Sequence, residues 1–540
     1  MPSSKPAAIV LNADALDVAS VVAVARTSAS VRVGTKAIAA MKASRRVVEA
    51  SLTDGQPHYG INTGFGSLAK QRISPADLRT LQRNLIRSHS AGVCGPLRPE
   101  LVRAMMLILA ASLARGLSGV RPIIVQTIVD CLNAGITPVV PSIGSVGASG
   151  DLAPLSHIAL ALIGEGEAWQ SANDPERRRA QRGPGASPGF VAARVPSAAA
   201  LRKAGIKPLV LEAKEGLALI NGTHLMCAEG ALLAHDADRL VDASIAALAM
   251  SIDGCRASHG FLDFRLSAAR NHGGPTVVAG CVRVMLAGSA IVMSHVENDP
   301  RVQDPYSLRA GPTVLGAVYA ALVNVEYQIT AELGAVTDNP LVFGRTGRPP
   351  HRSADEATAP SIVSGANFHG MPLALPLDHL AIALCHLAGI SERRTYLMTG
   401  AFEPESHLKP FLAPRPGLQS GLMIAQYTAA ACVNEMIGLA TPASVANLST
   451  CAGMEDYNSF GPRSAAKARR SLELAEHVVA IELLCAAQAL EHHRPLKSGR
   501  GVERAHATIR EVVPRLEDDR PLTPDIEAIV GLIRAGAFRS

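Results

Sequence analysis

The feature that most constrains the fold is a series of long segments with helical periodicity after Leu211. They cover residues 213–253, 276–297, 312–335, 371–396, 418–440 and 466–491. Many of them are apolar on most faces, and such a helix is buried on most sides. Alternation with a period of two residues, which would indicate strands, is rare. The sequence therefore predicts a mainly α-helical protein in which irregular loops are inserted between the helices of a long central bundle.

The composition agrees with a large buried core. Of the 540 residues, 48% are hydrophobic and 18% are charged, which excludes a disordered chain. Aromatic residues make up only 3%, whereas small apolar residues are abundant. Small apolar side chains suit closely packed helices, including helices that are buried between subunits.

Charge and cysteine usage limit the classes of partner. The formal net charge of +6 is spread along the chain, and the nearest approach to a basic tract is Arg177-Arg178-Arg179 in the polar segment 171–196, which we interpret as a surface excursion. We therefore expect no nucleic-acid partner. The nine cysteines show no C-x-x-C spacing, so we expect neither a disulfide framework nor a metal site.

The sequence also favours a cytoplasmic protein without a membrane segment. The N-terminal residues lack a positive stretch followed by an apolar one, so we expect no signal peptide. The most apolar segment, 276–293, contains Arg283 and is interpreted as a buried helix.

The chemistry is concentrated in an almost uncharged segment rich in Gly, Ser and Pro, residues 135–156. Its low polarity suggests that it is held inside the protein. Within it, GSVGASGDL (144–152) is open to three interpretations: a glycine-rich turn before a helix, a phosphate loop, or a peptide that cyclises. The phosphate loop is disfavoured because neither G-K-[ST] nor G-x-G-x-x-G is present.

Cyclisation accounts best for the residue types. In a tight bend the Gly150 nitrogen can attack the Ala148 carbonyl carbon, and loss of two waters then leaves a five-membered ring with Ser149 converted to an exocyclic methylidene. Gly150 allows the close approach because it has no Cβ. Ala148 offers an unhindered carbonyl, and Ser149 supplies the hydroxyl that leaves. The product is an electrophile of a kind that no ordinary side chain provides.

GSVGASGDLAPLSH resembles the signature of the histidine/phenylalanine/tyrosine ammonia-lyase family, whose Ala-Ser-Gly forms 4-methylidene-imidazol-5-one (MIO). Further segments resemble family motifs in the expected order: YGINTGFG (59–66), KEGLALINGT (214–223), QDPYSLR (303–309), TDNPLVF (337–343), SGANFHG (364–370) and SGLMIAQ (420–426). The resemblance spans most of the chain and implies elimination of ammonia from an aromatic L-amino acid, without a metal or a nucleotide.

The resemblance also implies roles for individual residues. Tyr59 corresponds to the base that removes the β-proton, although free tyrosine, with a pKa of about 10, needs nearby positive or dipolar groups to act near neutrality. Tyr306 corresponds to a second essential tyrosine, and Arg309 to the residue whose guanidinium binds the substrate carboxylate. The amides Asn221 and Gln303 orient the substrate or the prosthetic group. Phe368 lines the pocket.

Three residues favour histidine as the substrate. Ser88-His89 resembles the pair found in histidine enzymes, and His89 could bind an imidazole. Glu455, in MEDYNSF, matches a glutamate of histidine enzymes; a carboxylate accepts an imidazole N–H but is a costly neighbour for a phenyl ring. Met423 also follows the histidine pattern. The product would be trans-urocanate, and the resemblance is closest to histidine ammonia-lyase.

Several alternatives stay open. Met454, Tyr457 and His224 depart from the usual histidine-enzyme pattern close to these motifs. A tyrosine or phenylalanine lyase, an aminomutase, or a lyase acting on a modified histidine such as ergothioneine is the first alternative. A non-catalytic scaffold with the family fold is the second.

The resemblance finally implies a homotetramer whose active sites are shared between subunits. We expect residues 1–210 to form an N-terminal region that carries the catalytic loops and the MIO tripeptide. Residues 211–540 are expected to form the long-helix core and the oligomer bundle.

Overall fold

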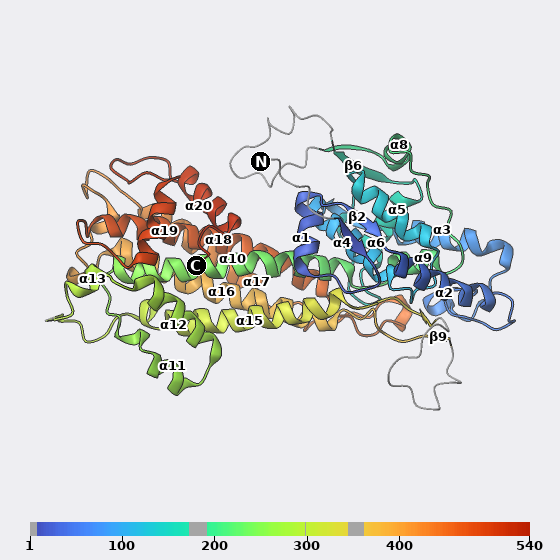
Figure 1. Ribbon diagram of the computed structural model, residues 1–540, viewed down its shortest axis with the longest axis horizontal. Helices are drawn as coiled ribbons and strands as arrows, with labels where there is room; N and C mark the ends of the chain where they lie inside the picture. Colours follow the sequence, from blue (N-terminus) through green and yellow to red (C-terminus); the bar gives the residue numbers. More distant parts are fainter. Residues whose placement is uncertain (1–7, 172–191, 298, 344–360, 540) are drawn as a thin grey trace.

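Long helices form the body of the protein, which confirms the mainly α-helical prediction. The structure is a computed structural model that describes residues 8–171, 192–297, 299–343 and 361–539. The longest helices run side by side along the molecule (Figure 1): α10 (His224–Gly254), α15 (Gly311–Leu333), α16 (Met371–Gly400), α17 (Met423–Leu439) and α18 (Gly461–Glu491). Alanines on α10, α16 and α18 are largely buried, so their small side chains let the helices pack closely.

Two of the predicted segments are each divided into two helices. Segment 213–253 becomes α9 (Glu215–Ile220) and α10, because Gly222 adopts a φ of 134° between them. Segment 276–297 becomes α12 (Gly273–Leu286) and α13 (Ala290–Met293), with Gly288 at a φ of 84° in the break. Helical periodicity continues across both breaks, so the apolar pattern alone did not reveal them. The first of them lies at the candidate site.

A buried ion pair links α16 to α18 inside the bundle. Arg394 and Glu482 are both fully buried, and the guanidinium donates from Nη2 to Oε2 at 2.7 Å. Ser251 of α10 and Ser391 donate to the same carboxylate at 2.7 and 2.6 Å. Because a buried charge is stable only when it is paired and hydrogen-bonded, this network fixes the three helices in one register.

Shorter helices and small sheets gather at one end of the molecule (Figure 1). The helices are α1 (Val18–Thr27), α2 (Thr35–Ser51), α3 (Leu78–His89), α4 (Pro99–Ala114), α5 (Pro122–Asn133), α6 (Leu152–Leu162) and α8 (Ser197–Lys203). The strand pairs are β1–β2 (Ile9–Leu11, Val31–Val33; parallel), β3–β5 (Val93–Pro96, Pro141–Ile143; antiparallel) and β8–β9 (Leu341–Val342, Ile362–Val363; antiparallel). A three-stranded antiparallel sheet has the order β4-β6-β7 (Ile136–Pro138, Glu167–Ser171, Ala192–Pro196). Helix α4 packs on both α1 and α10.

The opposite end of the bundle carries the remaining helices. These are α11 (Phe264–Arg270), α12, α13, α14 (Tyr306–Arg309), α19 (Arg500–Arg510) and α20 (Thr523–Ala535). α19 packs on α10 and α12, and α20 packs on α10 and α18.

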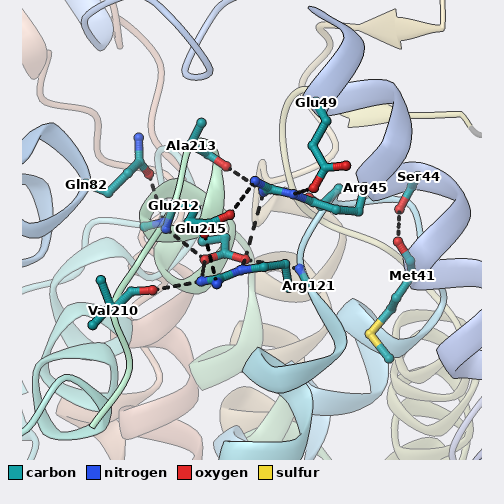
Figure 2. Close-up of polar contacts among 12 residues, drawn as sticks. Met41, Ser44, Arg45, Glu49, Gln82, Arg121, Val210, Glu212, Ala213 and Glu215 are labelled. Carbon is teal, nitrogen blue, oxygen red and sulfur yellow. Dashed lines mark hydrogen bonds and ion pairs between the residues drawn. The ribbon is translucent and has the colours of Figure 1, made fainter. Parts of the chain in front are cut away.

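A polar cluster anchors α9, the short helix that leads to the candidate site (Figure 2). Arg121 donates to Glu215 through Nε (2.8 Å) and Nη2 (2.6 Å), and the Glu215 side chain is fully buried. Arg45 donates to Glu212 at 2.9 Å and to the Ala213 carbonyl at 3.0 Å. These contacts tie the start of α9 to α2 and α5, so the residues that follow α9 are held by a rigid frame.

The segment expected to be a surface excursion is described only at its two ends. β6 and β7 pair there, and residues 172–191, including Arg177–Arg179, lie outside the described residues.

α15 and α16 are long and apolar enough to cross a membrane by length and composition alone. The most apolar window of α16 is 61% buried inside the protein, as expected for a core helix.

Candidate active site

The Ala148–Gly150 tripeptide lies in a tight bend between β5 and α6. Gly147 and Gly150 have φ angles of 68° and 71°, which favour glycine. A Cβ on Gly150 would lie 2.1 Å from the Gly222 carbonyl oxygen, and a Cβ on Gly147 would lie 2.2 Å from Ser459 Oγ. Both glycines are therefore required by the bend and by its close neighbours.

Backbone hydrogen bonds hold this bend against the junction of α9 and α10. The Gly222 amide donates to the Ser149 carbonyl at 3.3 Å, and the Asp151 amide donates to the Gly222 carbonyl at 2.7 Å. From the start of α18, the Phe460 amide donates to the Val146 carbonyl at 2.9 Å. Residues 147, 148, 150 and 151 are buried, as expected for the segment 135–156, whereas residues 142–144 of the same segment are exposed.

The Asp151 carboxylate joins the bend to α10 and has a role that the sequence analysis missed. It is fully buried and accepts hydrogen bonds from the Leu225 amide (2.8 Å), the Met226 amide (3.2 Å) and Ser145 Oγ (2.9 Å). Burial raises the pKa of this carboxyl to about 7, and the three donors oppose the rise. Asp151 thus binds the free amides at the start of a helix from another segment. The signal in the sequence is an acidic residue directly after the tripeptide.

Glu455 reaches the tripeptide from the loop before α18. Its Oε1 accepts a hydrogen bond from Ser149 Oγ at 2.8 Å, and its Oε2 accepts one from Thr450 Oγ1 at 2.8 Å. A residue on which the resemblance to histidine enzymes rests therefore contacts the central residue of the tripeptide.

Tyr59 lies half-buried in the 59–66 loop, where its hydroxyl accepts a hydrogen bond from the Gly66 amide at 3.2 Å. Burial raises the pKa of this hydroxyl above 10, and the hydrogen bond from the Gly66 amide opposes this rise with a smaller effect. The nearby Cys451 and Glu455 side chains raise the pKa slightly further. The lowered pKa that a base near neutrality needs is thus not produced within the single chain.

His89, Asn221 and Phe368 lie around the same bend. Burial lowers the pKa of the His89 imidazole at the end of α3, and the Leu85 carbonyl and the charge of Glu455 partly oppose this shift. Asn221 Nδ2 donates to the Asn339 carbonyl at 3.1 Å, and Oδ1 is buried without a hydrogen-bond partner among the described residues. Phe368 is two residues before Gly370, whose amide donates to the Gly147 carbonyl at 3.5 Å.

Gln303, Tyr306 and Arg309 lie at the other end of the bundle. Asp304, next to Gln303, accepts a hydrogen bond at 3.1 Å from the amide of Ser258, which lies just after the C-terminal end of α10. Asp151, next to the tripeptide, binds the opposite, N-terminal end of α10. The 31 residues of α10 span about 46 Å, which separates these three residues from the tripeptide of the same chain. The Arg309 guanidinium stacks 4.3 Å from the centre of the Tyr306 ring, and 71% of Tyr306 is exposed.

Met423 also lies far from the tripeptide of its own chain. It begins α17, and Gln426 in the next turn donates to Glu392 at 2.6 Å. The first turn of α16 is next to Gly147, and Glu392 lies 21 residues, or about 30 Å, further along this helix.

The structure thus brings eight of the twelve predicted site residues to one end of the chain and places four at the other. The eight are Tyr59, His89, Ala148, Ser149, Gly150, Asn221, Phe368 and Glu455.

The residues at the bend fit an MIO group. A Cβ on Gly150 would clash with Gly222, and the Ser149 carbonyl already accepts a hydrogen bond from the Gly222 amide. Ala148 is 5% exposed and has a small side chain.

Comparison with known proteins agrees with the fold. A family model described as aromatic amino acid lyase matches residues 16–511. A curated histidine ammonia-lyase from Anaeromyxobacter dehalogenans is 46% identical over 533 residues, covering 98% of this chain and 99% of that protein. The crystal structure of histidine ammonia-lyase from Trypanosoma cruzi has a TM-score of 0.86 and 36% identity, with 98% and 94% coverage. Tyrosine aminomutase from Streptomyces globisporus has a TM-score of 0.86 and 32% identity, with 98% of each chain covered. The chain belongs to the aromatic amino acid lyase family, a class of MIO-dependent enzymes.

Proposed function

We propose that this protein is an L-histidine ammonia-lyase, a carbon–nitrogen lyase that converts L-histidine to trans-urocanate and ammonia. The observation that carries the proposal is the contact between Glu455 and Ser149, 2.8 Å from oxygen to oxygen. This contact supports the proposal because it brings a carboxylate next to the tripeptide, where we expect the substrate to bind. A carboxylate accepts the N–H of an imidazole, whereas an unpaired carboxylate against a phenyl ring is costly. Similar proteins named histidine ammonia-lyase support the same substrate.

We infer that Ala148, Ser149 and Gly150 form the MIO group by themselves. The Gly150 nitrogen bonds to the Ala148 carbonyl carbon, whose oxygen leaves as one water with the hydrogens of the Gly150 and Ser149 amides, so that a C=N bond forms between Ala148 and Ser149. The Ser149 hydroxyl and α-hydrogen leave as a second water. When present, the group supplies an electrophile that assists departure of the amine.

The chain's own groups stabilise and orient the reaction. The Gly222 amide donates to the Ser149 carbonyl, and such a fixed donor stabilises negative charge that develops on that oxygen. Tyr59 is the proposed base for the β-proton, and the Arg309 guanidinium is the proposed partner of the substrate carboxylate. His89, Asn221, Gln303, Phe368 and Met423 are proposed to line the substrate site.

We propose that the active site is completed by partner subunits of a homotetramer. Gln303, Tyr306, Arg309 and Met423 are separated from their own tripeptide by the length of the bundle, so they can serve only the tripeptide of another subunit. Arg309 of the partner subunit would then bring to Tyr59 the positive charge that the single chain does not provide.

The surface of the bundle supports this assembly. Large apolar side chains on α15 and α17 are exposed in the chain: Tyr327 (70%), Tyr427 (59%), Ile424 (57%) and Ile437 (60%). Both helices pack on α16, and exposed apolar side chains spread along the helices of one bundle are typical of a protein interface. We further propose a cytoplasmic location, in keeping with nine free cysteines, and an organisation with residues 1–210 carrying the catalytic loops and 211–540 forming the oligomer bundle.

Substrate profiling tests the proposed function. Purified protein is incubated separately with L-histidine, L-tyrosine, L-phenylalanine and ergothioneine, and the products are separated and identified by absorbance. We expect urocanate from histidine at a kcat/KM at least about a hundredfold above that for the other three. Cinnamate, coumarate or a β-amino acid as the main product would show that the chain is another lyase or an aminomutase. The absence of any product would leave the non-catalytic scaffold as the remaining interpretation.

A further inference from the structure

A left-handed turn before α18 brings Thr450 and Glu455 opposite each other. The Thr450 amide donates to the Glu455 carbonyl at 2.9 Å, and the Glu455 amide donates back to the Thr450 carbonyl at 3.3 Å. The three residues that close the turn, Cys451, Ala452 and Gly453, have φ angles of 52°, 52° and 86°. Two of them carry a Cβ, and left-handed backbone at such residues is uncommon. The turn therefore holds these two side chains next to each other.

Each oxygen of the Glu455 carboxylate accepts a hydrogen bond from one hydroxyl. Ser149 Oγ donates to Oε1 and Thr450 Oγ1 donates to Oε2, both at 2.8 Å. In the part of the chain that the structure describes, these two hydroxyls are the hydrogen-bond donors to the carboxylate. The Ser149 hydroxyl is the group that leaves as water when the tripeptide cyclises. After maturation, Oε1 is free to accept a hydrogen bond from substrate while Oε2 keeps its bond from Thr450.

Asn458 holds the Thr450 hydroxyl in the required orientation. Asn458 is 1% exposed, and its Nδ2 donates to the Leu448 carbonyl and, at 3.4 Å, to Thr450 Oγ1. Because this hydroxyl accepts from Asn458, its own proton is directed to Glu455. The Asn458 backbone amide is in turn fixed by Asn447 Oδ1 at 3.0 Å. A buried amide thus orients a hydroxyl, which orients the carboxylate at the tripeptide.

We propose that Thr450 is a positioning residue for the lyase reaction, which acts by fixing the Glu455 carboxylate so that Oε1 meets the imidazole N–H of the substrate. The proposal rests on the proposed function, because it assumes that Glu455 binds the substrate side chain. A glutamate carboxylate rotates easily about its last torsion. Loss of the hydroxyl at Oε2 would allow Oε1 to turn away from the substrate.

A double-mutant cycle tests this role. Thr450→Val removes the hydroxyl at nearly constant volume, Thr450→Ser keeps it, and Glu455→Gln removes the carboxylate. The double variant Thr450→Val/Glu455→Gln completes the cycle, and Thr27→Val serves as a matched control. Thr27 is exposed on α1, and its hydroxyl binds only the Ala23 carbonyl in the described structure. Rates of urocanate release are divided by the fraction of chains that have lost two waters, read from intact mass, so that incomplete maturation is not counted as lost catalysis.

We expect Thr450→Val to lower kcat/KM for histidine about ten- to hundredfold, the effect of one hydrogen bond to a charged acceptor. Thr450→Ser should stay within about threefold of wild type, as should Thr27→Val. In the Glu455→Gln background, Thr450→Val should have less than about a threefold further effect, because the group through which it acts is gone.

If Thr450→Val lowers kcat/KM equally with and without the Glu455 carboxylate, the positioning role is overturned and a structural role remains. Loss of activity in Thr450→Ser would lead to the same conclusion. The wild-type enzyme separates this outcome from failure of the proposed function. If the wild-type enzyme releases urocanate and the losses are independent, only the positioning role fails. If it releases no urocanate from histidine, the proposed function fails and the positioning role fails with it.

Discussion

The Ser149 hydroxyl donates a hydrogen bond to the Glu455 carboxylate at 2.8 Å, across 306 positions of the sequence. The contact joins the residue proposed to become part of the electrophile to the residue proposed to select the substrate. The two are brought together because the α9–α10 junction and the start of α18 both bind the same bend: Gly222 meets Ser149, and Phe460 meets Val146. The packing of the bundle helices thus determines which residues meet at the site.

Substituting Gly150 should prevent maturation. In Gly150→Ala the new Cβ would lie 2.1 Å from the Gly222 carbonyl oxygen, in a backbone with φ of 71° that L-residues rarely adopt. We expect the intact mass to retain both waters and histidine turnover to fall at least about a hundredfold. Gly531→Ala on α20 is the control, since a Cβ there has no neighbour within 4 Å. Normal maturation of Gly150→Ala would contradict the geometry described for the bend.

Removing the Tyr59 hydroxyl should stop proton removal without affecting the prosthetic group. We expect Tyr59→Phe to lose two waters like the wild type, while kcat falls about 10²- to 10⁴-fold, the usual contribution of a positioned base. Intact mass and steady-state kinetics on one preparation separate the two effects. Wild-type kcat in this variant would exclude Tyr59 as the base.

Mixed oligomers should recover activity from two inactive variants. Ser149→Ala removes the electrophile, and Arg309→Ala removes the proposed carboxylate ligand at the far end of the bundle. If each site combines these residues from different chains, co-refolding equal amounts should restore about a quarter of the sites by random assembly. Each variant refolded alone gives the background. Recovery no greater than that background would show that both residues act within one chain and would refute the shared site.

Acidification should destabilise the protein through His224, the first residue of α10. This imidazole is fully buried, and burial lowers its pKa from 6.5 to about 4. The unfolded chain therefore binds a proton between about pH 6.5 and 4 that the folded chain excludes, so stability is complete above pH 6.5 and is lost as the pH falls through this window. From the shift, the loss at pH 5 is about 2 kcal/mol.

The urea midpoint at pH 7.5 and pH 5 measures this effect. In His224→Gln the decrease between the two pH values should be smaller by about 2 kcal/mol than in the wild-type protein, after conversion with the measured m value. An identical decrease in both proteins would assign the acid sensitivity to other groups, among which His493 is also buried with a pKa lowered to about 4.

The sequence predicted the bundle helices well, because their apolar periodicity reflects burial directly. Segments 312–335 and 371–396 match α15 (Gly311–Leu333) and α16 (Met371–Gly400) to within a few residues. The break at Asn221–Thr223 was not predicted, since the apolar pattern continues through it and only the φ of Gly222 reveals the turn. Small sheets such as β3–β5 were also not predicted, because strands of three or four residues are too short to show alternation.

The site was predicted as a set of residues but not as an arrangement. Motif resemblance singled out Glu455 and Arg309 equally, although the structure places one at the tripeptide and the other about 46 Å away along α10. Sequence order carries no information on which chain serves which site. The supporting residues Asp151 and Thr450 were missed because their roles depend on contacts with distant segments, the α10 amides and the Glu455 carboxylate.

The most direct test of the account is the intact mass of the purified wild-type chain beside that of Ser149→Ala. Cyclisation of Ala148–Gly150 predicts a wild-type mass lower than the sequence mass by two waters. The Ser149→Ala chain should keep its full sequence mass, because the hydroxyl that leaves is missing. A wild-type chain that releases urocanate while its mass equals that of the unmodified sequence would contradict the account at its centre.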